Sequence, residues 1–173
     1  MILGGGFAGA YAARRLEKKL FDERDVEVMV VAQENFLLFT PMLHEVASSE
    51  LAATDIVQPL RKMLRHTRIL IGRIETIDLA RKHVSVSHGG SAYRYDLTYD
   101  HLVLALGAVT NFYGMTGLEE HALTMKTFGD AILLRNRVIE LLELAAHETN
   151  EVVRNAMSSW RGVVLLELRL LAP

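Results

Sequence analysis

The chain opens with a short apolar run, a cluster of glycines and a segment with helical periodicity. Residues 1–3 form the stub of a strand and residues 4–9 a turn. A helix is expected over 8–20, where apolar positions recur every three or four residues. A second strand is expected over 26–31, where nearly every position is apolar. A strand, a turn, a helix and a strand within about 30 residues predict a βαβ unit with a right-handed crossover.

The pattern becomes less regular after this unit. Residues 35–50 are rich in Phe, Leu and Met without a clear period, and we expect irregular structure there. Thr54 is a candidate N-cap for a short helix over 54–64, which Pro59 should kink or break because proline lacks the N–H of the helical hydrogen bond. The β-branched character of residues 68–78 predicts one strand.

Alternating polar and apolar residues then predict an antiparallel hairpin. Residues 82–87 and 93–98 alternate on either side of the turn sequence His-Gly-Gly at 88–90. Residues 101–106 predict another buried strand, which ends before Gly107.

The last third of the chain is dominated by one long helix. Residues 109–125 predict a loop, and residues 127–147 an amphipathic helix. Its expected apolar side carries Ile132, Leu133, Val138, Leu141, Leu142 and Ala145. The pattern weakens from residue 150, and residues 160–173 are equally consistent with a strand or a helix.

Composition narrows the classes of function. The 173 residues suffice for one domain, and 50% hydrophobic and 23% charged residues are ordinary for a globular protein. A net charge of −2 gives no overall basic field for nucleic acid. No apolar run approaches the roughly 18 residues of a membrane helix, and no secretory signal precedes the glycines, so we expect a cytoplasmic location.

Metal and thiol chemistry find no support in the sequence. There is no cysteine, which excludes disulfides, thiolate metal sites and a redox dithiol within these residues. His44, Glu45 and His121 lack the spacing of a ligand cluster, so no metal site is expected.

The glycine cluster satisfies the pattern G-x-G-x-x-G. Gly4 permits a tight turn, Gly6 lets a pyrophosphate approach the backbone, and Gly9 lets the helix pack closely on the strand. The helix N-terminus would then present its N–H groups to the phosphates. A glycine-rich turn without a ligand is the alternative, but the strands and helix around this turn favour a dinucleotide.

The acidic residue that usually ends the second strand and binds the ribose is missing. Ala32 occupies the position where that carboxylate is expected. Glu34 lies two residues later and is a candidate ribose ligand, as are the amides of Gln33 and Asn35. A merely solvated turn residue is an equally good interpretation of Glu34.

Four separated segments resemble type II NADH dehydrogenases, the single-chain FAD-dependent NADH:quinone oxidoreductases. They are I-L-G-G-G-F-A-G at 2–9, N-F-L-L-F-T-P-M-L at 35–43, I-V-Q-P-L-R at 56–61 and Y-D-H-L-V-L-A-L-G at 99–107. The likeness extends over about residues 1 to 148 and is far more specific than the glycine turn alone.

The resemblance implies an α/β fold with a parallel sheet and an inserted antiparallel hairpin or meander. Residues 1–110 would form a Rossmann-like FAD-binding domain, and residues 111–148 a connecting loop and long helix. Residues 149–173 would form a divergent tail or the truncated start of a second domain.

The resemblance also implies the residues that contact FAD. Gly4, Gly6, Phe7, Ala8 and Gly9 would line the pyrophosphate. Thr40 and Pro41 would approach the flavin, a backbone group near Ile74 would meet the adenine, and Ala105 and Gly107 would close over the cofactor. No side chain would be catalytic, because NADH passes a hydride to the flavin and the reduced flavin reduces a quinone.

The chain departs from this family after the long helix. The family continues into a second strand and a second glycine turn that binds NADH. Here residues 160–166 could form that strand, but no glycine turn follows. We therefore expect the NADH-binding domain to be absent, with apolar surface left free for self-association. Peripheral association with the inner face of a membrane is a further expectation from the family.

Two other functions remain open at this stage. One is a non-catalytic nucleotide-binding remnant of a truncated gene. The other is a simple NAD(P)-dependent Rossmann enzyme, which the hairpin and residues 35–43 disfavour. Disulfide reductases and sulfide:quinone oxidoreductases share the expected fold but work through cysteines, which this sequence lacks.

Overall fold

The computed structural model describes residues 1–89 and 93–158, and divides the chain into two compact units. The first unit contains residues 1–38 and 57–108, and the second contains residues 39–56 and 109–173. The predictions for residues 160–173 lie outside the described residues. The predicted division into an FAD-binding domain (1–110), a connecting loop and helix (111–148) and a tail (149–173) stays a prediction.

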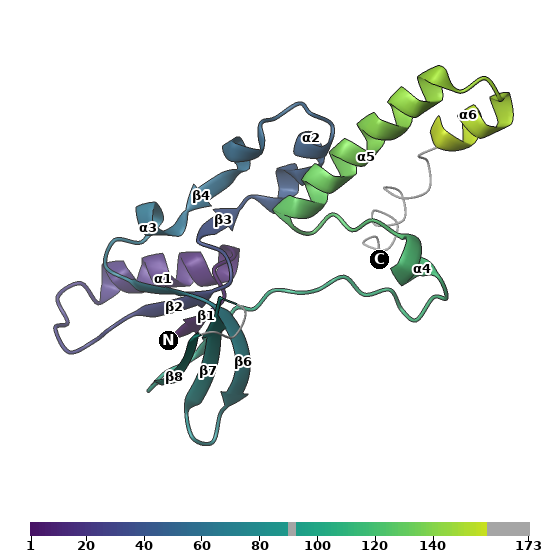
Figure 1. Ribbon diagram of the computed structural model, residues 1–173. Coiled ribbons are helices and arrows are strands. Elements are labelled where there is room, and N and C mark those ends of the chain that lie inside the picture. The colour runs from purple at the N-terminus through teal and green to yellow at the C-terminus, as the bar shows by residue number, and fades with distance from the viewer. Residues whose placement is uncertain (90–92, 159–173) are drawn as a thin grey trace. The chain divides into compact units, whose positions relative to one another are not determined.

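A parallel sheet of four strands forms the centre of the first unit (Figure 1). Its strands are β1 (Ile2–Leu3), β2 (Met29–Ala32), β5 (Arg68–Ile71) and β9 (Val103–Leu104), in the order β5-β2-β1-β9. All three neighbouring pairs are parallel. The predicted α/β fold with a parallel sheet is confirmed.

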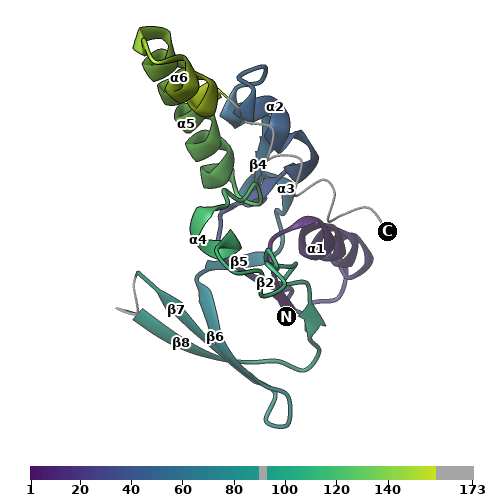
Figure 2. The same ribbon diagram turned by 90° about the vertical axis from the view of Figure 1, so that its right-hand side faces the viewer.

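Each face of this sheet is covered by a different layer. Helix α1 (Phe7–Lys19) packs on one face, where Ile2 and Val30 meet Ala10 and Ala13 in one buried cluster. An antiparallel meander covers the other face, as Figure 2 shows. Its strands are β6 (Arg73–Asp78), β7 (His83–His88) and β8 (Tyr93–Thr98).

The meander confirms the predicted hairpin and corrects the strand before it. Strands β7 and β8 pair antiparallel, as expected for residues 82–98. The single strand predicted over 68–78 is wrong, because β5 and β6 belong to different sheets and Gly72 separates them. A Cβ on Gly72 would lie 2.6 Å from Cγ1 of Val86, so the chain changes sheets where only a glycine leaves room.

The strand predicted over 101–106 is shorter and more exposed than expected. Only Val103 and Leu104 form β9, and their side chains are 38% and 57% exposed because β9 lies at the edge of the sheet. An apolar run indicates a strand but does not distinguish an edge from a centre. The second predicted strand also begins late, at Met29, and Val26 is exposed.

Residues 35–64 form short elements that the sequence did not resolve. The irregular structure expected over 35–50 is wrong, because it contains β3 (Phe36–Leu38), a 3-10 helix (Thr40–Met42) and α2 (Leu43–Ala47). The single helix over 54–64 is also wrong. The chain forms a 3-10 helix (Ala53–Ile56), then β4 (Val57–Pro59) paired with β3, and then α3 (Leu60–Met63). The break at Pro59 is confirmed.

The second unit is built around α5 (Phe128–His147), which matches the long helix predicted over 127–147. Its neighbours are α2 and α6 (Glu151–Ser158), and the predicted loop before it contains α4 (Leu118–His121). Ala131, Leu134 and Ala145 are its buried residues. Leu133 and Leu142, expected on the apolar side, are 58% and 51% exposed. No helix in the described part of the chain is long and apolar enough to cross a membrane.

Candidate functional site

The glycine turn connects β1 to α1, and its first glycine is required by both conformation and space. Gly4 has φ +114°, which side chains rarely adopt, and its N–H donates to the carbonyl of Val31 at 2.8 Å. A Cβ on Gly4 would overlap the carbonyl oxygen of Ala105 at the end of β9. The turn is therefore pressed against the neighbouring strand.

Gly9 performs the packing role expected of the last glycine in the motif. It is buried in the first turn of α1. A Cβ there would overlap the carbonyl oxygen of Gly4 and lie 3.4 Å from Cβ of Ala105. The structure thus brings Gly4, Gly9 and Ala105 together, and the helix approaches the sheet more closely than any residue with a side chain would allow.

Gly6 is different, because it lies beside open space. It is the exposed N-cap of α1 in an extended conformation, φ −73° and ψ −169°, and a Cβ on it would meet no atom within 4 Å. No side chain caps this helix end and no acidic residue lies in its first turn. Phe7 and Ala8 follow it at the surface. The positive end of the helix dipole therefore faces a free volume, which suits the pyrophosphate of a dinucleotide.

Gly5 belongs to the same turn, although the motif leaves its position unspecified. Its Cβ would lie 2.8 Å from Cβ of Ala32 and 3.0 Å from Cδ1 of Leu60. These two distances show that the turn lies directly over the end of β2. In the sequence, the unbroken run of three glycines was the only signal that Gly5 is required.

The end of β2 carries the candidate ribose ligands. Ala32 is 3% exposed beneath Gly5 and offers no polar atom to a ribose. Glu34 is exposed, and its carbonyl oxygen lies 3.9 Å from the same Cβ position on Gly5. Within the described residues its carboxylate has no hydrogen-bond or ion-pair partner. Glu34 therefore offers an unpaired carboxylate from a residue whose backbone lies beside the turn.

The remaining predicted site residues lie farther along the chain. Gly107 follows β9 with φ +76° and is exposed. Ile74 is half-buried in β6, next to the β-bulge between Ile74 and Thr76. Thr40 and Pro41 are exposed in the 3-10 helix at the start of the second unit.

The described residues offer no candidate metal site. Among residues 1–89 and 93–158, no group of three or more His, Cys, Asp or Glu side chains is placed to hold a metal ion. Glycines packed tightly between β1, β2 and α1, together with an uncapped helix N-terminus beside open space, are the features of an α/β dinucleotide-binding protein.

Comparison with known proteins identifies the family. Residues 1–152 match the family model described as pyridine nucleotide-disulphide oxidoreductase, so the chain belongs to that family.

Individual relatives resemble the chain over most of its length. It is 33% identical to the type II NADH:quinone oxidoreductase Ndh of Mycobacterium tuberculosis, over 87% of this chain and 32% of that protein. It is 34% identical to the mitochondrial external alternative NAD(P)H-ubiquinone oxidoreductase B4 of Arabidopsis thaliana, over 84% of this chain and 25% of that protein. The chain thus spans about a third or less of the length of these relatives.

A solved structure supports the same fold. The chain superposes on NDH2 from Plasmodium falciparum, solved in complex with NADH, with a TM-score of 0.77. The sequences are 23% identical, and the match covers 87% of this chain and 30% of that one. The predicted resemblance to type II NADH dehydrogenases is confirmed as a relationship of sequence and fold.

Proposed function

We propose that this chain is the FAD-binding part of an NADH:quinone oxidoreductase. The observation that carries the proposal is the turn itself, where Gly4, Gly5 and Gly9 are sterically required and Gly6 is open to a ligand. Its support comes from the relatives, whose names describe NADH or NAD(P)H as donor and a quinone as acceptor.

Each residue of the proposed site has a binding role. Gly4, Gly6, Phe7, Ala8 and Gly9 hold the pyrophosphate of FAD at the N-terminus of α1. The backbone at Ile74 meets the adenine, and Ala105 and Gly107 close the site beside the turn. Thr40 and Pro41 approach the flavin.

No side chain of this chain needs to act as acid, base or nucleophile in the proposed reaction. When bound, FAD would supply the chemistry of hydride transfer from NADH and of electron transfer to a quinone. The chain binds and orients that cofactor. Because quinones with long apolar tails are lipid-soluble, we also propose a peripheral location at the inner face of a membrane.

We propose that Glu34 holds the ribose hydroxyls in place of the acid missing at Ala32. The support is that Glu34 has an exposed carboxylate with no partner among the described residues, and that its backbone lies beside Gly5. Glu34→Gln should weaken FAD binding about tenfold, the loss expected for one hydrogen bond to a charged group. Asp22→Gln, in the turn after α1, is the charge-matched control. Equal FAD affinities for both variants would leave Glu34 a solvated turn residue.

The visible spectrum of the purified chain tests the cofactor. A yellow protein with flavin absorption, or a colourless one that becomes yellow after incubation with FAD, supports the proposal. A chain that takes up no FAD under any loading condition would be a non-catalytic remnant. The observation that favours this second function, a non-catalytic remnant, is Ala32 at the position where a ribose-binding carboxylate is expected.

Anaerobic addition of NADH tests how much of the reaction these residues perform. Their sequence holds one G-x-G-x-x-G turn, enough for one dinucleotide. We expect the flavin absorption to bleach slowly, as in an unassisted encounter. Rapid, saturable bleaching would show that NADH also has a site on this chain.

A further inference from the structure

Two basic segments of the sequence lie on one flank of the first unit. Helix α1 carries Arg14, Arg15, Lys18 and Lys19, and residues 60–66 carry Arg61, Lys62 and Arg65. All seven are exposed. More than forty residues separate the two segments along the chain, so the fold alone brings them together.

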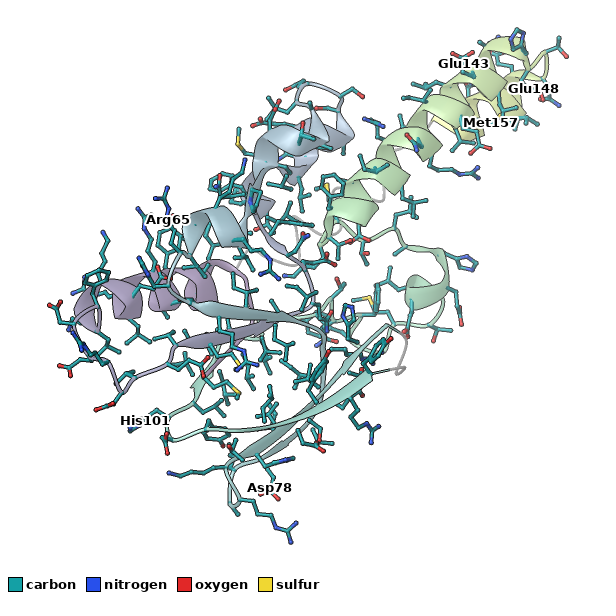
Figure 3. The ribbon with its side chains drawn as sticks, turned by 60° about the vertical axis from the view of Figure 1, so that its left-hand side comes forward. Arg65, Asp78, His101, Glu143, Glu148 and Met157 are labelled. Carbon is teal, nitrogen blue, oxygen red and sulfur yellow. The ribbon has the colours of Figure 1, made fainter. Side chains whose placement is uncertain are left out.

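The packing of α1 against α3 and the residues after it is well defined. Ala10 and Ala13 of α1 share a buried cluster with Leu60 and Leu64. The carboxylate of Glu17 accepts the backbone N–H of His66 at 2.7 Å, and the rings of Phe21 and His66 stack edge to face at 5.3 Å. The two helices lie side by side in Figures 1 and 2, and Figure 3 places Arg65 beside α1.

The charge on this flank is unbalanced. Helix α1 and residues 60–66 contain the seven cations and a single acid, Glu17, for a net charge of +6, whereas the whole chain carries −2. The carboxylate of Glu17 already accepts a hydrogen bond from the backbone N–H of His66. None of the seven cations forms an ion pair or side-chain hydrogen bond within the described part of the chain, unlike Arg68, Arg81 and Arg137.

Two exposed aromatic residues accompany the basic side chains, Tyr11 in the second turn of α1 and Phe21 two residues after the helix ends. Tyr11 is 54% exposed and Phe21 is 67% exposed. Long basic side chains that carry their charge outward, with aromatic rings beside them, are typical of surfaces that lie on a lipid headgroup layer. The acids Asp22, Glu23 and Asp25 begin just beyond Phe21 and mark where the basic flank ends.

We propose that the basic flank, defined as the seven cations with Tyr11 and Phe21, binds an anionic phospholipid surface. Charge complementarity selects anionic headgroups, and the flanking rings favour a lipid layer over a soluble polyanion. The inference rests on the peripheral location proposed above and names the surface responsible. Binding to vesicles does not require bound flavin. The vesicle experiment and the flavin-binding experiment can therefore give independent results.

Co-sedimentation of the full chain with vesicles tests the proposal. Vesicles of phosphatidylcholine alone are compared with equimolar phosphatidylcholine and phosphatidylglycerol. Binding is expected only to the anionic vesicles and should fall steeply with added salt. Equal binding to both vesicles, or binding to neither, would overturn the proposal.

Matched charge variants locate the surface. Lys62→Gln with Arg65→Gln, and separately Lys18→Gln with Lys19→Gln, should each weaken binding roughly 30-fold, since each cation near an anionic surface contributes about fivefold. The control is Arg73→Gln with Arg94→Gln, which removes two exposed, unpaired cations from the meander. Thermal unfolding of every variant confirms folding.

Two outcomes would contradict the assignment. One is a control variant that loses as much binding as the flank variants. The other is binding of labelled single-stranded DNA at protein concentrations at which the chain does not bind anionic vesicles. That result would make the flank a nucleic-acid-binding surface.

Discussion

At the scale of single residues, the glycine turn separates steric need from ligand contact. Gly4, Gly5 and Gly9 each lack the space for a Cβ, whereas Gly6 has open space around it and an ordinary φ of −73°. The turn contains four glycines, of which Gly4, Gly5 and Gly9 are required by the packing around them, whereas Gly6 alone leaves room for a ligand.

This difference gives a paired prediction. Gly6→Ala should leave the unfolding midpoint unchanged and weaken FAD binding, because its methyl group occupies only the ligand's space. Gly9→Ala should destabilise the fold by about 1–3 kcal/mol, the usual cost of overpacking, because the obstacle is the backbone oxygen of Gly4. Chemical denaturation and flavin titration measure the two effects. Equal stability of the two variants would refute the steric assignment.

At the scale of elements, the switch from β5 to β6 depends on one residue. Gly72 follows β5, and its Cβ would lie 2.6 Å from Cγ1 of Val86 and 2.7 Å from the carbonyl oxygen of Ser87. Both neighbours belong to β7, so the meander packs directly against the point where the chain leaves the parallel sheet.

Gly72→Ala is therefore expected to destabilise the first unit by about 1–3 kcal/mol. Gly129→Ala in α5 is the control, because its nearest neighbour is Oγ1 of Thr127 at 3.7 Å. That change should stabilise the chain by up to about 1 kcal/mol, since alanine favours helix over glycine. Urea titrations of the two variants should shift in opposite directions. A neutral Gly72→Ala would show that the meander relaxes freely.

Helix α5 begins with a complete capping box. The hydroxyl of Thr127 accepts from the N–H of Asp130 at 3.2 Å, and the carboxylate of Asp130 accepts from the N–H of Thr127 at 2.8 Å. Burial alone would raise the pKa of Asp130. The N–H groups of Thr127 and Lys126, with the hydroxyls of Thr127 and Thr124, outweigh it and hold that pKa below its ordinary value of 3.8.

This lowered pKa fixes the sign of a pH effect. A carboxylate whose pKa is lower in the folded state stabilises that state above its unfolded pKa, and the stability is lost as pH falls through the folded value. Asp130→Asn should remove this acid-dependent part of the unfolding free energy, measured below pH 4. Thr127→Ala should cost about 1 kcal/mol at neutral pH, whereas Thr127→Ser should restore it. A pH profile that Asp130→Asn leaves unchanged would contradict the assignment.

At the scale of the whole molecule, apolar side chains remain exposed in both units. In the first unit they include Leu104 on the edge strand. In the second they include Leu133, Ile139, Leu142 and Leu144 on α5, each about half exposed or more. Exposed large apolar side chains in this number favour association in solution.

We expect the chain to self-associate as its concentration rises. Sedimentation velocity should show a rising average mass, and Leu133→Gln with Leu142→Gln should lower it without a loss of helix by circular dichroism. Glu140→Gln with Glu143→Gln, on exposed positions of the same helix, is the control. A strictly monomeric wild-type chain at all concentrations would refute this expectation.

The sequence by itself determined the βαβ beginning, the hairpin, the long helix over residues 127–147, and the family. Those features can be predicted because periodicity, glycine spacing and motif residues are local properties of the chain. Only the tertiary structure decided which sheet each strand joins, that Val103 and Leu104 form an exposed edge, and that Gly72 is a switch point. It also gathered the two basic segments on one flank. These features arise from contacts between residues distant in the chain, which no local pattern encodes.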